Sequence, residues 1–346
     1  MSNEPSVPAR APYPFEDPAL RSGGFDPEAY IPGYGVPVRR PRFQHKVWKH
    51  LLLLLLTLGT TTVAGACHYH SFASDLGRIE VDATIWALLL QGLWYSLAIL
   101  TILGAHEMGH YTFCRRYNVD ATLPYFLPAP FFAGTLGAVI RIREPFPTRT
   151  VLFDIGVAGP IAGFLAMIPI LFAGLAMSRV TEIPAASEEL LSLGEPLLFQ
   201  WGAWLIFGTP PEGQSLNIHP MVFAAWFGML ATALNLLPFG QLDGGHIIYA
   251  ALGRWSTPIS LMTVLGAIVM TFVSTSWLFI TVMMVLMLLV LGPRHPRVIY
   301  EHEPLGPGRI AIAIFALLIL AVCFTPAPIE PYELIRTPQT QSAGRS

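Results

Sequence analysis

Long apolar runs recur along this 346-residue chain, and they constrain its fold more than any other feature. About seven of them are long enough, or nearly so, for helices that cross a hydrocarbon core, which takes about 17 to 25 helical residues. We place these spans at residues 49–66, 84–112, 151–177, 219–239, 257–274, 276–292 and 309–325. Because only Ser-Thr-Ser-Trp separates the fifth span from the sixth, these two could instead form one kinked or re-entrant unit.

The composition also indicates a membrane protein. Hydrophobic residues make up 53% of the chain and charged residues only 12%, whereas soluble domains carry about 25% charged residues. The net charge of -2 gives no electrostatic reason to expect a nucleic-acid partner. The three cysteines are widely separated, so they predict neither a disulfide framework nor a sulfur metal site. We therefore predict an all-α polytopic membrane protein whose surroundings are the lipid bilayer.

The chain divides into three predicted regions. Residues 1–46 are rich in Pro, Gly and charge, which predicts a disordered cytoplasmic tail. Residues 47–325 form the transmembrane domain, and residues 326–346 form a short C-terminal tail. The first apolar run resembles a signal peptide but begins too late in the chain, so we expect it to remain as a membrane-spanning signal anchor.

Basic residues predict the orientation of the spans. If successive spans alternate in direction, the basic residues that flank them fall on one side, which the positive-inside rule assigns to the cytoplasm. These residues are Arg39, Arg40, Arg42, Lys46, Lys49, Arg115, Arg116, Arg149, Arg254, Arg294 and Arg297. The opposite side receives loops 67–83 and 178–218, and we expect His68 and His70 to lie in the first of them as solvated residues rather than as a second metal site.

The segment between the second and third spans, LPYFLPAPFFAGTLGAVIRIREPFP, is too broken by Pro and Gly for a helix. Its part GAVIRIRE alternates apolar and charged residues, which is typical of a strand. We predict a small membrane-associated β-hairpin or re-entrant loop, shielded by protein or lying in the interface, because lipid does not tolerate open sheet edges. Arg141, Arg143 and Glu144 could orient an extended peptide there, but a solvated strand face is the preferred interpretation.

Two histidines and a glutamate stand at the end of the second span in the sequence HEMGH. His106 and His110 are four residues apart, so a helix projects them from one face toward a common ion. HExxH is a known zinc arrangement in which the glutamate, here Glu107, acts as general base. Ionisable residues inside a span cost roughly 2.5 to 3.5 kcal/mol and usually serve a function. The alternative is that these side chains only mark the polar end of a helix at the headgroups.

A second polar motif, NLLPFGQLDGGH, ends the fourth span at the same predicted depth. It brings Asn235 and Asp243 to the membrane level of the two histidines. A catalytic zinc commonly has three protein ligands and one open position, and Asp243 can supply the third ligand. His246 follows closely enough to support a ligand, although a capping or interfacial role is equally compatible with its position.

These motifs resemble those of the site-2 protease family of intramembrane zinc metalloproteases, peptidase M50. The resemblance rests on HEMGH at 106–110, NLLPFGQLDGG at 235–245 and DIGVAGPIAG at 154–163. In addition, LPYFLPAP and GTLGAVIRIREP are similar to the connecting segment of bacterial and plastid members without an inserted PDZ domain. The resemblance covers most of residues 84–250, and it implies a three-helix catalytic core within the transmembrane domain.

Carried over to this chain, the resemblance implies that His106, His110 and Asp243 bind one Zn²⁺ per active site. Glu107 would be the general base, and Asn235 would hold the substrate or the developing oxyanion. Gly159, Pro160 and Gly163 would let helices approach closely. The implied activity is hydrolysis of a peptide bond within or near the cytoplasmic end of a transmembrane protein substrate, such as a single-span membrane-anchored regulator. The implied location is the inner membrane of a bacterium, with the active site and the N-terminus toward the cytoplasm.

Two other classes of function fit part of the sequence. A transporter or metal-ion carrier would explain polar residues in the spans, but it gives no reason for a glutamate directly after the first histidine. A catalytically inactive membrane chaperone is disfavoured because all the proposed catalytic groups are present. Asp154, at the start of the third span, is expected to stabilise a helix N-terminus rather than to take part in catalysis.

Overall fold

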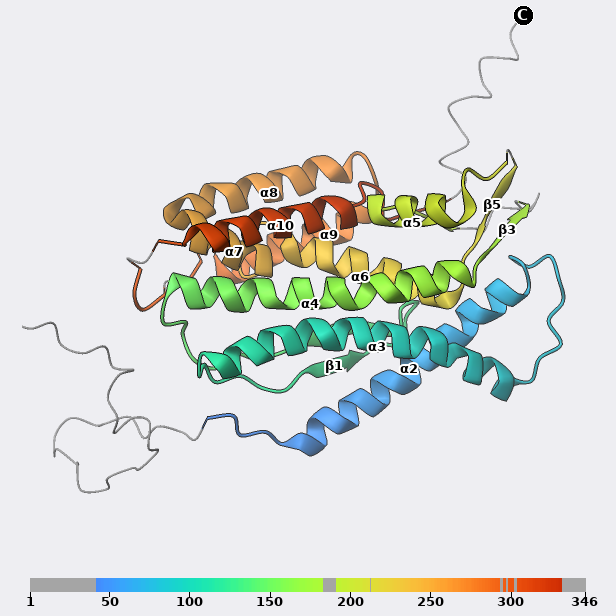
Figure 1. The fold of residues 1–346 in the computed structure, drawn as a ribbon, viewed down its shortest axis with the longest axis horizontal. Helices are drawn as coiled ribbons and strands as arrows, with labels where there is room; N and C mark the ends of the chain where they lie inside the picture. Colours follow the sequence, from blue (N-terminus) through green and yellow to red (C-terminus); the bar gives the residue numbers. More distant parts are fainter. Residues whose placement is uncertain are drawn as a thin grey trace, which may run out of the picture. The chain divides into compact units, whose positions relative to one another are not determined.

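The computed structural model describes residues 42–182, 191–211, 213–292, 295–296, 298–301 and 304–331. They form a mostly helical structure (Figure 1). The helices are α2 (Val47–Ala73), α3 (Ile85–Arg116), α4 (Arg149–Ala176), α5 (Leu197–Phe207), α6 (Pro220–Leu236), α7 (Asp243–Leu252), η1 (Gly253–Trp255), α8 (Ser256–Thr271), α9 (Ser276–Leu291) and α10 (Pro307–Cys323). The predictions for tail residues 1–41 and 332–346, with Arg39, Arg40, Arg294 and Arg297, lie outside the described residues.

The helices agree with the predicted spans and identify a multi-pass membrane protein. Four described stretches are long and apolar enough to cross a membrane, namely α2, α3, α4 and the continuous stretch Asp243–Thr271. The helices α5, α6, α9 and α10 are shorter and also apolar. Every predicted span therefore contains an apolar helix, while the helix boundaries differ from the predicted ones by several residues.

Three predictions about the connections were wrong. Helix α2 continues to Ala73, so His68 and His70 lie on a helix instead of a loop; the chain turns only at Asp75–Gly77, where φ is positive. The predicted loop 178–218 contains the 11-residue helix α5, which is too short to be recognised as a span. Residues 42–46 do not belong to a free tail, because the Arg42 guanidinium pairs with Glu144 at 3.0 Å.

Helices α3, α4 and α6 lie side by side and run in alternating directions (Figure 1). Their shared core contains fully or almost fully buried apolar side chains from all three helices: Ile99, Ile102, Met167, Leu171 and Met229. Small residues allow close approach of backbones, as membrane helices require. A Cβ at Gly228 on α6, for instance, would lie 2.9 Å from the Ile102 side chain on α3. Helices α3, α4 and α6 thus form one packed unit, the core helices.

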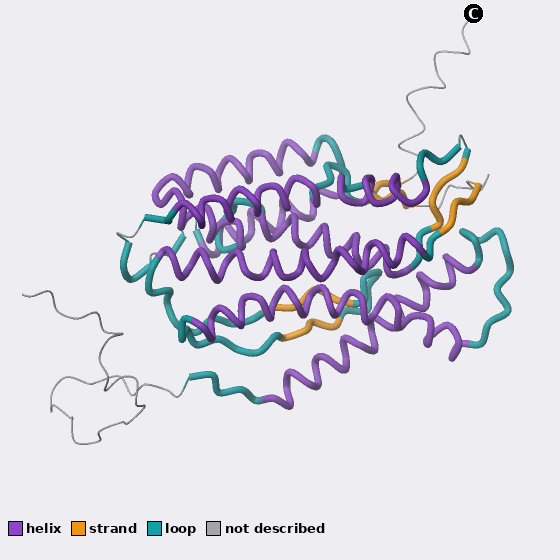
Figure 2. Tube along the Cα trace, in the orientation of Figure 1, coloured by secondary structure: helices purple, strands orange, loops and turns teal. Residues whose placement is uncertain are grey.

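The predicted hairpin is present between α3 and α4. Strands β1 (Tyr125–Pro128) and β2 (Thr135–Val139) are antiparallel, with Tyr125 opposite Val139 and Pro128 opposite Thr135. Figure 2 shows these strands running alongside α3. An isolated bridge between Ala121 and Ile142 continues the pairing beyond the strands. Strand β2 begins at Thr135, two residues before the alternating sequence GAVIRIRE, and it ends at Val139, before the charged part of that sequence.

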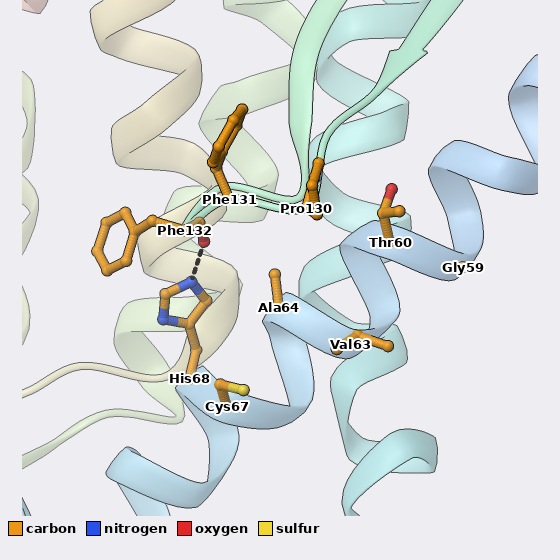
Figure 3. Close-up of a pocket in the computed structure, with 9 residues that line it drawn as sticks. All are labelled: Gly59, Thr60, Val63, Ala64, Cys67, His68, Pro130, Phe131 and Phe132. Carbon is orange, nitrogen blue, oxygen red and sulfur yellow. Dashed lines mark hydrogen bonds between the residues drawn. The ribbon is translucent and has the colours of Figure 1, made fainter.

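The tip of the hairpin docks against α2 and α3 (Figure 3). The Gly134 carbonyl accepts a hydrogen bond from the Thr60 hydroxyl at 2.7 Å, and the Ala133 carbonyl accepts one from Tyr95 at 2.8 Å. Gly134 has φ +72°, and a Cβ there would lie 2.6 Å from the Thr61 Cα, so this position needs glycine. The backbone groups at the tip are thereby paired with helix side chains, which meets the requirement for irregular backbone among membrane helices.

A cavity of about 420 Å³ lies beside this tip. Figure 3 shows its lining, which consists of Gly59, Thr60, Val63, Ala64, Cys67, His68, Pro130, Phe131 and Phe132. The His68 ring donates through Nε2 to the Phe132 carbonyl at 3.1 Å and packs against Tyr95 and Phe223. His68 is therefore a structural residue that joins α2 to the hairpin.

Two further two-stranded sheets follow α4. Strand β3 (Arg179–Glu182) pairs with β5 (Gln214–Asn217), and β4 (Leu191–Leu193) pairs with β6 (Ile329–Pro331), both antiparallel. The β3–β5 sheet holds the turn after α2, because the Asp75 carboxylate accepts hydrogen bonds from Thr181 at 2.8 Å and from Asn217 at 2.9 Å. This polar cluster closes the end of the helices opposite to the C-terminus of α3 (Figure 1).

Candidate metal centre

Three side chains that are far apart in the sequence converge beside α4. His106 and His110 lie on α3, with their Nε2 atoms 3.2 Å apart. Asp243 is the first residue of α7, and its two carboxylate oxygens lie 3.2 Å from His106 Nε2 and 3.3 Å from His110 Nε2. All ligand atoms lie within 4.8 Å of one another, and both histidines are buried. The predicted meeting of these three residues is confirmed.

The spacing of these atoms suits a zinc ion. A tetrahedral zinc with bonds of about 2.0 Å has ligand atoms about 3.3 Å apart, which matches the distances between the Nε2 atoms and the carboxylate oxygens. The His110 Nδ1–H donates to the Ile155 carbonyl at 2.7 Å. This bond fixes the tautomer of His110, so the lone pair of Nε2 is free for a metal.

Helix α4 makes room for the two histidine rings. A Cβ at Gly159 would collide with the His110 imidazole, and one at Gly163 would lie 3.1 Å from the His106 Cβ. On the facing side, a Cβ at Gly109 would meet the Ala158 carbonyl. The motif that predicted close helix packing thus has a definite use, because it sets α3 and α4 close enough to shape the ligand cluster.

The glycines after Asp243 determine where α7 begins. A Cβ at Gly244 would collide with the Leu236 carbonyl at the end of α6, and one at Gly245 would collide with the Gly240 carbonyl in the turn. Only a chain without side chains at these two positions can begin a helix this close to the preceding turn. The Asp-Gly-Gly sequence therefore sets the ligand at the helix N-terminus, where a carboxylate is also electrostatically favoured.

The two other predicted site residues lie beside the ligands. Glu107 is buried on the same stretch of α3. Its side-chain carboxylate is hydrogen-bonded to the backbone of Ile140, just past the end of β2. Asn235 lies near the end of α6, and its Nδ2 is 3.5 Å from His106 Nε2. The hairpin and all three core helices therefore contribute to one site.

Several contacts around the site could not be predicted from the sequence. The expected role of Asp154 at a helix N-terminus was wrong, because α4 begins at Arg149 and its first turn holds no acidic residue. Asp154 instead pairs with Arg309 of α10 through two bonds of 2.8 and 2.7 Å and accepts a hydrogen bond from Tyr117. In the sequence, Arg309 could have been noticed as a lone basic residue at the start of the apolar helix α10. The Ile155 carbonyl that orients His110 has no sequence signal at all.

The charged residues after β2 hold the chain segment that leads into α2. Arg143 pairs with Asp120 at 3.2 Å and donates to the Gln44 carbonyl, while Glu144 accepts from Arg42. Arg143 remains exposed, as the preferred prediction expected, whereas Glu144 is only partly exposed and is held by its ion pair with Arg42. The alternating pattern could not reveal partners that lie a hundred residues away in the chain.

The comparisons with known proteins agree with this geometry. The sequence model of Peptidase family M50 matches residues 94–279. The chain is 30% identical over 251 residues to the probable zinc metalloprotease EGY2, chloroplastic, of Oryza sativa subsp. indica, covering 71% of this chain and 45% of the relative. It is 28% identical over 232 residues to the probable zinc metalloprotease EGY1, chloroplastic, of Arabidopsis thaliana, covering 60% of this chain and 41% of the relative.

The chain thus spans less than half the length of these curated relatives. No solved structure matches it. The matched family segment covers more than half of the chain and contains the histidine motif, the α4 glycines and the Asp243 motif. By this match and by its buried cluster of His106, His110 and Asp243, the chain belongs to peptidase family M50.

Proposed function

We propose that this chain is an intramembrane zinc metalloprotease that hydrolyses a peptide bond within or near the cytoplasmic end of a transmembrane substrate helix. The observation that carries the proposal is the convergence of His106, His110 and Asp243 among apolar helices, with Glu107 and Asn235 beside them. One zinc ion per active site fits the three ligand atoms.

Glu107 acts as the general base in this proposal. Bound zinc supplies Lewis-acid polarisation of the scissile carbonyl and lowers the pKa of a water. Glu107 accepts the proton of the attacking water and later donates it to the leaving amine. Its backbone hydrogen bond with Ile140 restrains the carboxylate. Such a restraint keeps the base aimed at the site without a large loss of entropy during the reaction.

Asn235 stabilises the charge that develops on the substrate carbonyl oxygen. Its amide Nδ2 lies 3.5 Å from His106 Nε2, so it faces the ligand cluster. An amide N–H aimed at a developing oxyanion in a dry site contributes more than it would in water. Asn235 therefore acts in the transition state rather than as a metal ligand.

The proposed substrate is a transmembrane helix that unwinds locally before attack. A helix hides its peptide bonds within its own hydrogen bonds, so helix-breaking residues near its cytoplasmic end favour cleavage. The hairpin offers an extended edge beside the site, since Ile140, just past the end of β2, contacts Glu107. The unwound segment adds to this edge as a strand, which aligns its backbone with the metal.

The proposed location is the inner membrane of a bacterium, with the site toward the cytoplasm. Arg115 and Arg116 end α3 one turn after His110, and Arg149 begins α4 near the same end. Basic residues near span ends favour the cytoplasmic side. The connection between α3 and α4, residues 117–148, carries the hairpin, in accordance with the proposed likeness to members without an inserted PDZ domain.

The test uses purified wild type and Glu107→Gln in detergent with a reporter protein that has one transmembrane helix. We expect the wild type to cleave the reporter, a chelator to stop cleavage and added zinc to restore it. Glu107→Gln should keep one zinc per chain and lose cleavage by at least about 10²-fold. Glu182→Gln, on exposed β3, is the matched control and should cleave like the wild type.

Full cleavage by Glu107→Gln would remove the proposed role of this residue. Zinc uptake into vesicles without any cleavage would instead support the ion-carrier alternative. In cells, the protein that accumulates beside Glu107→Gln, but not beside the wild type, identifies the physiological substrate class.

A further inference from the structure

A second pair of histidines lies one helical turn beyond the ligand Asp243. His246 Nδ1 is 2.6 Å from Nε2 of His295, which lies in the connection between α9 and α10. The two rings meet edge to face, with centroids 4.9 Å apart. Neither residue of this pair belongs to the ligand cluster, so the pair needs a separate explanation.

The hydrogen bonds of the pair have a fixed direction. His295 Nδ1 lies 2.7 Å from the Pro296 carbonyl, and a carbonyl can only accept, so His295 carries its proton on Nδ1. Burial lowers the pKa of His295, partly offset by this carbonyl, which keeps the ring neutral near pH 7. Its Nε2 is then an acceptor, and His246 Nδ1–H must be the donor. The Pro296 carbonyl, in the α9–α10 connection, therefore determines the tautomer of His295 and through it that of His246.

The connection that carries His295 is itself anchored. The Tyr249 ring of α7 stacks on His295, with centroids 4.3 Å apart, and its hydroxyl donates to Glu301 at 3.0 Å. The Ile299 and Tyr300 amides donate to the carbonyls of the segment just before α4, at 3.1 and 2.9 Å. His295 is thus tied both to α7 and to the start of α4.

Helix α7 needs such an external support to hold Asp243 in place. It has ten residues and begins Asp-Gly-Gly, and its N-terminus has no side-chain cap among the described residues. Glycine weakens a helix because it loses more backbone freedom on folding than other residues, and Gly253, with φ +56°, interrupts the helical stretch between α7 and α8. The orientation of its first turn must therefore come from packing.

His246 provides this packing between two parts of the metal centre. A Cβ at Gly156 on α4 would lie 3.0 Å from the His246 Cβ. The neighbouring Ile155 carries the carbonyl that orients His110. His246 therefore lies between the helix turn that presents Asp243 and the backbone that holds His110, and His295 determines how its ring is turned.

We propose that His295 is a positioning residue for the zinc ligand Asp243 and that it acts through His246. The assignment rests on the proposed zinc-binding function. Removing His295 should release the His246 ring, loosen the first turn of α7 and weaken zinc binding. Hydrogen-bonded partners outside the ligands typically change metal affinity by about 10- to 100-fold.

The test is a double-mutant cycle on zinc affinity, measured in the purified full chain by competition with a coloured chelator. His295→Ala and His246→Ala should each bind zinc about 10-fold more weakly. The double variant should bind no more weakly than His246→Ala, because the two act as one unit. His295→Gln, whose side-chain oxygen can replace the Nε2 acceptor, should recover most of the affinity.

The matched control is His68→Ala, which removes another half-buried histidine bonded to a carbonyl but lies beside the hairpin tip. It should leave zinc affinity unchanged. Unchanged affinity in His295→Ala, or additive losses in the double variant, would overturn the assignment. If His295→Ala does not fold, the same comparison is made with His295→Gln and His295→Phe, and equal weakening in both would overturn it.

The readout also separates this proposal from the proposed function, because zinc binding is measured without cleavage. A wild type that binds no zinc would overturn both. A wild type that binds zinc and cleaves, beside a His295→Ala variant of equal affinity, overturns only the role of His295.

Discussion

Two polar clusters lie along α4, and their hydrogen bonding differs in kind. After its C-terminal end, the Asp75 carboxylate accepts hydrogen bonds from the Thr181 hydroxyl and the Asn217 amide, and it forms longer ion pairs with Arg78 and Arg179. Beside its first half, two imidazole nitrogens and a carboxylate converge on one point with three lone-pair atoms. The first cluster is complete as a protein structure. In the second cluster the lone-pair atoms outnumber the hydrogen-bond donors, so a cation can complete it. This excess of lone-pair atoms over donors distinguishes a metal site from a structural hydrogen-bond network.

The largest effect is expected when one metal ligand is removed from the second cluster. Asp243→Ala should weaken zinc binding by more than about 100-fold, because even residues outside the ligand set cost about 10- to 100-fold. Zinc content after dialysis against a chelator should fall from about one per chain in the wild type to near zero. Asp75→Ala, which removes a carboxylate of the balanced cluster, should retain zinc. Equal zinc loss in both variants would end the distinction between the two clusters.

The next test changes the space around the ligands without changing any of them. Gly159→Ala places a methyl group against the His110 ring, so it should weaken zinc binding by about 10-fold or more. The control is Gly266→Ala on α8, where a Cβ meets nothing within 4 Å and where alanine favours the helix by about 1 kcal/mol. Zinc titration of both variants measures the difference. Normal affinity in Gly159→Ala would mean that α4 does not shape the cluster.

An ion pair near the metal centre offers an intermediate case. Asp154 and Arg309 form two charge-assisted hydrogen bonds, and Asp154 is buried while Arg309 is half-buried. Arg309→Ala should lower the free energy of unfolding by about 1 to 3 kcal/mol and change zinc affinity by less than about threefold, since neither residue of the pair belongs to the ligand cluster. Denaturant unfolding in micelles and zinc titration provide the two readings. A loss of affinity without a loss of stability would contradict this view.

The smallest expected effect concerns acid stability of the balanced cluster. The Thr181 hydrogen bond lowers the pKa of Asp75 most, burial opposes it, and Asn217, Arg179 and Arg78 lower it further below 3.8. A lowered folded-state pKa gives stability that is fully present well above the unfolded value and is lost as pH falls through the folded one. Between about pH 5 and pH 3, the chelator-treated wild type should lose more stability than Asp75→Asn. Parallel stability curves for the two proteins would contradict it.

The sequence was sufficient for the parts of this molecule that depend on short-range patterns. The HExxH spacing predicted that His106 and His110 share one helix face, and the apolar runs predicted the helices of the spans, because helix periodicity and hydrophobic length act within one element. Long-range pairing was not predictable. Nothing near His110 signals that the Ile155 carbonyl will hold it, and nothing near Glu144 signals Arg42. Helix α5 was missed because 11 apolar residues carry too weak a signal for a span.

The distance in sequence between the ligands has a consequence for biosynthesis. Asp243 follows His110 by 133 residues (243 − 110). At about 5 to 20 residues per second, translation takes roughly 7 to 27 seconds to cover that length. During this time α3 already carries His106, Glu107 and His110, and the third ligand does not yet exist. The three-ligand site is therefore complete only after α7 has emerged and packed against α3 and α4, so acquisition of the metal reports that these helices have come together.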